Sequence, residues 1–470
     1  MKNRYYFIFV IFIAISTQLK GQSDMIGYGL TKTLPQANSL NPAMLPDYKF
    51  SLGLPGLSGL HFNGGNNFTS LKLITSKDAE GNMPVDEIFG GLRRNNRATG
   101  SVNLNVFHLG IRGEQSYTAF SINTRAFARA SIPKSLLGLP YYGNASSEFE
   151  DGIMDFKRFS VKSMAFTEVA LSHGREILGD KMTAGIRLKY LMGHAYADMP
   201  GMDASIRTYG NNEFRGDSID FISNGFNIRA GGVAGALANE EDDITVGDAL
   251  NNSGFAIDLG ATYKFSRKIN FFASINDLGF IKWKNNTYNA YIPKTSVTFT
   301  GLDLIDLING DDNALDDQID SLVDDMEIVE TRNESFTTSL TSKLYAGASY
   351  QLTDRQTASA ILYSELYRGT LIPALTAIYN FQYNTFFNFA LSGTLMNGRP
   401  NIGTGFTLNL IGLQIYLATN DLLSLTNPVN GRMVDVRTGI NFTFGNINKG
   451  KSRAKKNSKN TIDTIELGID

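Results

Sequence analysis

The feature that most constrains the fold is an alternation of apolar and polar residues with a period of two, repeated along most of the chain. In the stretch 256–265, Ile257 and Leu259 share one face, whereas Asp258 lies on the other. The same alternation occurs at residues 183–190 and 436–444. Successive side chains of a β-strand point to opposite faces, so each stretch predicts a strand with one apolar face. A soluble β-sandwich gives the same alternation, so the period alone does not place that face.

The lengths of the connections favour a membrane barrel. Short polar links recur at residues 112–116, 174–181, 264–268, 352–356, 380–384 and 409–413. The links between them are often long and irregular, and short turns at one rim with long loops at the other are typical of outer-membrane barrels. Two strands for each turn, an opening strand before Ala98 and a closing strand that ends at Phe444 predict an all-β, transmembrane antiparallel β-barrel of about 14 strands. Residues 181–265 and 269–352 could each contain another hairpin, which leaves sixteen strands open.

The first residues have the features of an export leader. Lys2 and Arg4 precede an apolar run at Tyr5–Ser16, which is too short to span a membrane. We therefore expect a secretory signal peptide at residues 1–21. Its removal takes three of the 43 basic residues and leaves 40 against 45 acidic ones, a net charge of about −5 that argues against nucleic acid as a partner. The chain has no cysteine, which excludes disulfides and thiolate metal sites.

A segment at residues 22–48, between the leader and the first strand, lacks the alternating period and contains the sequence SLNPAMLPDY. Pro42 disfavours a helix at Asn41, and its ring removes a backbone donor. Irregular backbone at membrane depth is tolerated only where protein or water surrounds it. We therefore predict a short N-terminal luminal plug with Asn41, Pro42 and Ala43 inside the barrel near its periplasmic mouth. The alternative is a periplasmic lead-in to the first strand.

Two further segments interrupt the barrel expected at residues 49–445. Residues 301–334 carry twelve acidic residues and one basic residue, and we expect a solvated acidic extracellular loop. A calcium loop is the alternative there, but the D-x-D-x-D-G register is missing. Apolar residues at helical spacing predict a short amphipathic helix in this loop, through Leu315, Ile319, Leu322, Met326 and Val329. Residues 446–470 form a basic tail, expected in the periplasm as a disordered arm or as a contact for an acidic partner protein.

Aromatic residues and one short repeat occur near the predicted strand ends. Rings gather at residues 190–196, 280–283, 363–367 and 379–387, and we interpret them as a girdle at the lipid–water boundary. The alternative is the general preference of aromatic residues for strands. Asn-Asp-Leu occurs at residues 276–278 and again at residues 420–422. Because Asn-Asp commonly opens a turn, we interpret both as loop entries rather than as sites.

No motif for catalysis or metal binding is present. The four histidines, at positions 61, 108, 173 and 194, are scattered and show no metal-ligand spacing. We therefore expect neither a cofactor nor a metal, and no enzyme activity.

The leader, the segment that ends in Asn41, Pro42 and Ala43, and the run of about fourteen strands together resemble the long-chain fatty acid transporter (FadL) family of outer-membrane barrels, which includes PorV of the type IX secretion system. The stretches at residues 275–283 and 437–445 are similar to an uncharacterised Bacteroidota family of predicted outer-membrane β-barrel proteins. The resemblance implies a location in the outer membrane and an N-terminal plug. No ligand-contacting residue of the fatty-acid transporters can be matched here.

Two functions follow as hypotheses. The first is passage of a hydrophobic small molecule through a barrel that sits in outer-membrane lipid and is gated by the plug. The second is a non-transporting accessory barrel, similar to PorV, that binds a partner protein through the acidic loop or the basic tail. A soluble secreted β-protein is a third reading. It would require that the protein stay in solution without detergent.

Overall fold

The computed structural model describes residues 25–78, 81, 84–143, 152–209, 218–239, 251–299, 324–384, 386–396, 399–427 and 429–447. The expected leader at 1–21, most of the acidic loop and nearly all of the basic tail lie outside these residues. In the described part strands dominate, and the longest helix has nine residues. No helix in this part of the chain is long and apolar enough to cross a membrane.

The described strand segments form a single sheet in which every pairing is antiparallel. The first eleven are β1 (Tyr48–Gly53), β2 (Gly59–Asn66), β3 (Asn95–Arg112), β4 (Ser116–Pro133), β5 (Ile153–Asp155), β6 (Ser160–Ile177), β7 (Met182–Met199), β8 (Ala204–Tyr209), β9 (Ser218–Gly232), β10 (Asn252–Lys264) and β11 (Ile269–Trp283). The next ten are β12 (Tyr288–Phe299), β13 (Val329–Arg332), β14 (Phe336–Ser339), β15 (Ser342–Thr353), β16 (Gln356–Tyr367), β17 (Thr370–Tyr383), β18 (Phe387–Met396), β19 (Arg399–Leu410), β20 (Leu413–Thr419) and β21 (Met433–Asn446).

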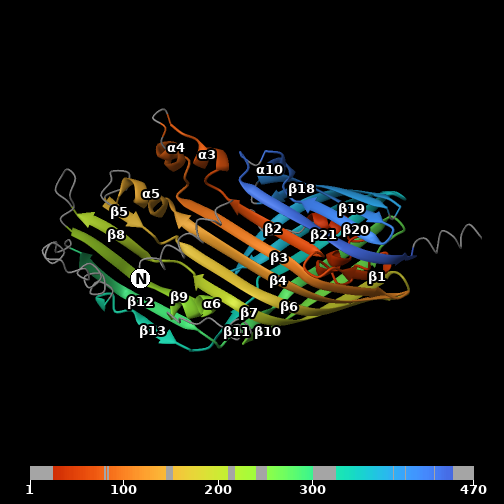
Figure 1. Cartoon of the computed structure of the whole chain (residues 1–470), viewed down its shortest axis with the longest axis horizontal. Coiled ribbons are helices and arrows are strands. Elements are labelled where there is room, and N and C mark those ends of the chain that lie inside the picture. The colour runs from red at the N-terminus through yellow and green to blue at the C-terminus, as the bar shows by residue number, and fades with distance from the viewer. Residues whose placement is uncertain are drawn as a thin grey trace, which may run out of the picture.

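Consecutive segments that pair with the same neighbours are parts of one wall strand. β1 and β2 both pair with β21 and with β3. Elsewhere the neighbouring segments are themselves consecutive: β5 pairs with β8 and β6 with β7, for example. In this way β5 continues into β6, β7 into β8, β9 into β10, β11 into β12, and β13 through β14 into β15. Fourteen wall strands result, and the first of them pairs with β21, so the sheet closes into a barrel (Figure 1). The predicted fold class, with fourteen rather than sixteen strands, is confirmed.

The extra length at residues 181–265 and 269–352 is used to extend existing strands. β8 pairs with β9, and β12 with β13, beyond the level at which β10 and β11 pair. A short helix, α6 (Val233–Ala238), separates β9 from β10. In Figure 1 this extension lies at one end of the long axis and β1 lies at the other.

The two ends of the barrel differ as predicted. Each of the six short links joins consecutive wall strands, and together with the start of β1 and the end of β21 they form one end, which we call the turn rim. The remaining connections form the other end, the loop rim; most of them are longer, but only two residues separate β16 from β17 and β18 from β19. Four further short helices belong to these connections: α3 (Leu71–Thr75), α4 (Val85–Gly90), α5 (Lys134–Tyr142) and α10 (Leu422–Thr426). The first turn of α10 is capped by Asp421, whose carboxylate accepts a hydrogen bond from the Ser424 N–H at 3.1 Å.

The alternating period places apolar side chains outside and polar ones inside. On β7, Leu188 is 54% exposed, whereas the flanking Arg187 and Lys189 are 4% and 6% exposed. On β10, Leu259 is exposed and Asp258 is fully buried. In a β-sandwich the apolar faces pack inward. An apolar exterior with a polar interior is the arrangement of membrane barrels.

The girdle interpretation is wrong for part of the aromatic set. Trp283 is fully buried and faces inward, where its Nε1–H donates to Thr338 Oγ1 at 2.9 Å. Tyr196 stacks on it with ring centroids 5.4 Å apart. Tyr379 and Tyr383 are exposed on the outer face. Strand alternation sends neighbouring rings to opposite faces, so a cluster in the sequence does not become a cluster in space.

The predicted helix in the acidic loop does not reach Val329. That residue begins β13, which pairs with β12, and the earlier helix positions up to Leu322 lie outside the described residues. The backbone N–H and C=O groups of β12 need hydrogen-bond partners, and residues 329–332 supply them as a strand rather than as a helix.

Candidate functional site

The chain before β1, residues 25–47, is here called the N-terminal segment. It contains a short helix, α2 (Met25–Gly29), and a 3₁₀ turn, η1 (Pro35–Ser39). Pro35 occupies the first position of η1, where a missing N–H is tolerated. Elements this short gain little from their own hydrogen bonds, so contacts with the strands hold them in place.

One side of the N-terminal segment packs on an apolar wall. Met25, Ile26 and Leu30 are at most 1% exposed, and the ring of Tyr28 stacks on Phe272 with centroids 5.2 Å apart. The wall consists of apolar side chains from β11, β15 to β18 and β20: Phe272, Tyr345, Ile361, Tyr363, Ala374, Ile378, Ala390, Met396, Tyr416 and Ala418. We call these residues the apolar wall. The strands on the opposite side of the barrel carry buried polar side chains, so the interior has one apolar side and one polar side.

Hydrogen bonds tie the N-terminal segment to strands all around the barrel. The Asn38 side chain accepts from Ser172 Oγ of β6 at 2.8 Å. The Thr33 side chain accepts from the Asn388 amide of β18 at 2.7 Å, and its carbonyl accepts from the Gln414 amide of β20 at 2.6 Å. β6 lies on the opposite side of the barrel from β18 and β20, so the N-terminal segment contacts the inner face of the barrel on both sides.

Asn41, Pro42 and Ala43 lie where β6, β7, β10 and β11 approach the turn rim. Asn41 is fully buried, its Nδ2 donates to the Ala273 carbonyl at 3.1 Å, and its Oδ1 accepts from the Ala43 N–H at 2.9 Å. Pro42 lies against Gly185 of β7, where an added Cβ would come within 2.2 Å of the Pro42 carbonyl carbon. The absence of a side chain at Gly185 therefore allows the close approach.

The Leu40 carbonyl is a point at which several donors converge. It accepts hydrogen bonds from Tyr28 Oη at 3.1 Å, from Ser274 Oγ at 2.7 Å and from Asn276 Nδ2 at 2.8 Å. Asn276 also donates to the Ser39 carbonyl at 3.3 Å. We call this group of contacts the Leu40 anchor.

A second fixed point lies at the start of α2. The Ile26 N–H donates to Asn420 Oδ1 at 3.2 Å. The Asn420 backbone and side-chain N–H groups donate to Asp435 Oδ1 at 2.7 and 3.0 Å, and His61 Nε2 lies 3.0 Å from Asp435 Oδ2. We call this the Ile26 anchor.

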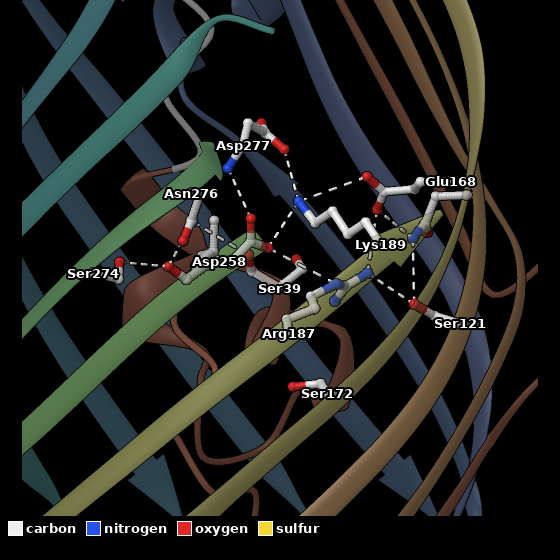
Figure 2. A network of polar contacts seen from close by, with 12 residues as sticks. Ser39, Ser121, Glu168, Ser172, Arg187, Lys189, Asp258, Ser274, Asn276 and Asp277 are labelled. Atoms are coloured by element: carbon white, nitrogen blue, oxygen red, sulfur yellow. Dashed lines mark hydrogen bonds and ion pairs between the residues drawn. The ribbon is translucent and has the colours of Figure 1, made fainter. Parts of the chain in front are cut away.

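Six charged side chains adjoin the Leu40 anchor and form what we call the luminal charge cluster; five of them are buried and labelled in Figure 2, and the sixth, Arg125, is 20% exposed. It contains three cations and three anions from five wall strands: Arg125, Glu168, Arg187, Lys189, Asp258 and Asp277. Lys189 Nζ lies 2.7 Å from both Asp258 Oδ2 and Asp277 Oδ1. Equal numbers of the two signs at these distances compensate the cost of burying each charge.

Asn276 and Asp277 both point inward because β11 contains a bulge. The pairing of β11 with β10 shifts register between Ile257 and Leu259, and Asp277 has a left-handed backbone with φ of 62°. The Asp277 N–H donates to Asp258 Oδ1 at 2.7 Å. A regular strand would send one of these two neighbours to the lipid side. The bulge thus places the Leu40 anchor and the luminal charge cluster on consecutive residues.

The space that remains beside the N-terminal segment is small and polar. One cavity of about 60 Å³ lies between η1 and His108, Ser121 and Arg187. Another of about 80 Å³ lies between Ser39 and Lys189. A water molecule occupies about 30 Å³ of liquid, so each cavity has room for only a few waters. A larger cavity of about 320 Å³ lies at the loop rim between β9, β12, β13 and the start of β14.

The described residues offer no metal site, since no group of three or more potential ligands gathers anywhere in this part of the chain. The four histidines are scattered in the sequence, and two of them have quite different surroundings in the structure. His61 belongs to the Ile26 anchor, whereas Thr118 Oγ1 lies 2.9 Å from His173 Nδ1 on the exposed surface. The carboxylates of the luminal charge cluster are engaged by cations. Their arrangement holds the interior of the barrel together.

Sequence reasoning missed both anchors. The two Asn-Asp-Leu repeats, interpreted as loop entries, supply Asn276 to the Leu40 anchor and Asn420 to the Ile26 anchor. As loop entries the two copies differ: residues 276–278 lie within β11, so the interpretation is wrong there, whereas residues 420–422 follow the end of β20 and lead into α10, as expected. The repetition of Asn-Asp-Leu was the signal in the sequence that could have pointed to the two anchors. Only the contacts show that both copies bind the same segment.

Comparison with known proteins gives one family and several barrels of solved structure. The model of a family of unknown function (DUF5723) matches residues 42–420. A Pseudomonas aeruginosa FadL homologue is 10% identical, with a TM-score of 0.45, over 92% of this chain and 100% of that one. The toluene transporter TbuX of Ralstonia pickettii is 12% identical, with a TM-score of 0.40, over 87% of this chain and 94% of that one. The toluene transporter TodX of P. putida is 9% identical, with a TM-score of 0.40, over 88% of this chain and 94% of that one. No curated protein matches the sequence.

Proposed function

Since this chain belongs to the DUF5723 family, whose function is unknown, we propose its function from the site itself: a non-enzymatic barrel of the outer membrane that passes small hydrophobic molecules. A closed barrel leaves no unpaired strand edge in lipid, and the apolar exterior matches the hydrocarbon layer. In this proposal residues 1–21 direct export, and the turn rim faces the periplasm.

The N-terminal segment is the plug in this proposal, with Asn41, Pro42 and Ala43 as its seat near the turn rim. The motif makes backbone contacts with β7, β10 and β11, and the Leu40 and Ile26 anchors hold the two ends of the segment. The small cavities beside it leave little free space, so a solute passes only when the plug moves.

The single observation that carries the proposed solute class is the apolar wall. The lumen of a water-filled porin is polar. Here seventeen buried apolar residues, seven of the N-terminal segment and ten of the strands, form one cluster inside the barrel. Displacement of the plug would expose a strip of aromatic and aliphatic side chains, which favours an apolar solute over a polar one.

Uptake of a radiolabelled small hydrocarbon by cells that express the protein tests this function. We expect faster uptake than in cells without it, and faster again when residues 25–40 are deleted, because the apolar wall is then free. In the deletion background, Ile378→Asn should reduce uptake by placing an amide on the apolar wall. Tyr379→Asn, which alters the next residue on the outer face, is the matched control. Equal uptake with and without the protein would contradict the proposed function.

The second candidate is an accessory barrel that binds a partner protein, and the extension at the loop rim favours it. Strands β8, β9, β12 and β13 project beyond the neighbouring wall. β9, β12 and β13 border the 320 Å³ cavity, which Tyr291 and Val329 line with exposed side chains. Native mass spectrometry of protein extracted gently from membranes separates the two functions. A defined complex with another protein favours the accessory role. A single chain that carries a hydrophobic adduct favours passage.

A further inference from the structure

The left-handed backbone at Asp277 is held by its own side chain. The carboxylate accepts two hydrogen bonds from Arg125, at 2.9 and 3.0 Å, and one from Lys189 at 2.7 Å. The Asp277 N–H is bound to Asp258. Residues other than glycine rarely adopt a positive φ, so these bonds maintain a conformation that an isolated strand would abandon.

The residue before the bulge depends on that conformation. Asn276 reaches the Leu40 and Ser39 carbonyls only because its side chain points inward beside that of Asp277 (Figure 2). If the bulge relaxed into a regular strand, the pairing register would shift by one residue. One of the two side chains would then turn to the outer face.

We propose that Asp277 is a positioning residue of the plug. The luminal charge cluster fixes the bulge, and the bulge presents Asn276 to the Leu40 anchor. The strength with which the plug is held is therefore set by a group that does not touch the plug backbone. This inference rests on the proposed function of the N-terminal segment as a plug.

The absence of cysteine from the chain provides a clean reporter. Ala37 is fully buried in η1, so Ala37→Cys reacts with a membrane-impermeant maleimide only when the N-terminal segment leaves its place. In outer-membrane vesicles that contain the full-length protein, we expect Asp277→Asn to raise the labelling rate about tenfold, which corresponds to about 1.4 kcal/mol. Asp421→Asn is the matched control. Asp421 follows the other anchor asparagine, but its carboxylate caps α10, and the rate should stay unchanged.

The decisive comparison is a double-mutant cycle in this reporter. Asn276→Ala should raise labelling as much as Asp277→Asn does, and the double variant should label no faster than either single variant, because both changes break one connection. Effects that multiply in the double variant would overturn the proposal, since Asp277 would then act independently of Asn276. An unchanged rate in Asp277→Asn would overturn it as well.

Two further measurements keep the outcome interpretable. If Asp277→Asn does not give a folded barrel in the heat-modifiability assay, the variant Asp277→Asn with Lys189→Gln replaces it, because it removes one charge of each sign. Hydrocarbon uptake is measured in the same strains. Faster labelling without faster uptake would support the positioning of the plug and contradict the proposed passage. Faster uptake with unchanged labelling would contradict the positioning proposal alone.

Discussion

Arg129 of β4 and Glu365 of β16 form an ion pair across the interior of the barrel. Five wall strands separate β4 from β16 in one direction around the ring and seven in the other, so the pair joins opposite walls. The Arg129 guanidinium also lies 4.6 Å from the ring centre of Tyr367. Arg368, the residue after Tyr367, donates to the carbonyl of Pro200, which follows the end of β7, at 2.5 Å. Direct contacts near the loop rim thus join opposite walls, in addition to the hydrogen bonds that both walls make with the N-terminal segment.

Glu365→Gln should weaken this contact between the opposite walls. Glu365 is 1% exposed, and the loss of its charge would leave the Arg129 side chain, which is 12% exposed, without its ionic partner. Removing one member of a buried ion pair costs about 3 to 5 kcal/mol, so we expect a loss of this size in the free energy of unfolding, measured in detergent by urea titration. The conductance of the reconstituted protein in planar bilayers should rise, because the two walls are no longer held together.

The exposed pair of Glu330 and Arg332 on β13 is the matched control. Its side chains are 39% and 56% exposed and 3.4 Å apart, and an exposed pair contributes less than about 1 kcal/mol. Glu330→Gln should therefore change neither stability nor conductance appreciably. If both glutamate variants behaved alike, the wall-to-wall contact would have no role in closure.

Leu188→Arg should hinder insertion of the barrel into a bilayer. Leu188 is 54% exposed on the outer face of β7, and an arginine at the middle of the bilayer costs about 2 to 4 kcal/mol in a membrane barrel. Val329→Arg, at a residue 56% exposed on the extension beyond the neighbouring wall, should cost almost nothing. Folding yields into lipid vesicles, followed by heat modifiability on gels, measure the difference. Equal yields would contradict the assignment of the outer face to lipid.

The barrel could be predicted from the sequence because its two signals are local. Alternation in stretches such as 256–265 reports one strand at a time, and each short turn joins strands that are neighbours in the chain. The breaks within strands were not predictable in this way. α6 interrupts one wall strand between Gly232 and Asn252, yet both parts keep the neighbour that β7 provides. Register across such a break is fixed by pairing with another strand.

The site was predicted only in part because its contacts join distant residues. The prolines correctly marked residues 41–43 as irregular, since Pro acts on its own backbone. By contrast, the luminal charge cluster draws on five strands, and alternation states only that each charge faces inward. The bulge at Asp277 was hidden as well, because it breaks the same alternation from which the strand was inferred.

Asn420→Ala should release the α2 end of the N-terminal segment. The change removes the acceptor of the buried Ile26 N–H and the side-chain donor to Asp435 Oδ1, whereas the backbone N–H of residue 420 remains. An unsatisfied buried polar group costs about 1 to 3 kcal/mol. In a Met25→Cys reporter, whose native side chain is fully buried, we expect faster maleimide labelling. Asn430→Ala, at an exposed residue of the following loop, serves as the control. Unchanged labelling would show that the Ile26 anchor does not hold this end.

Gly185→Ala should displace the Asn41–Ala43 motif without unfolding the barrel. The added Cβ would meet the Pro42 carbonyl carbon at 2.2 Å and the Ala43 nitrogen at 2.4 Å, both backbone atoms that cannot turn aside as a side chain could. The motif must therefore move away from β7, and the Ala37→Cys reporter should label faster. Gly393→Ala on β18, where an added Cβ meets nothing within 4 Å, should label at the original rate. Because both variants place alanine in a strand, any shared effect on the barrel cancels, and a difference between them reports the contact of the N-terminal segment with Gly185. Equal rates would place the seat of the segment elsewhere than at Pro42.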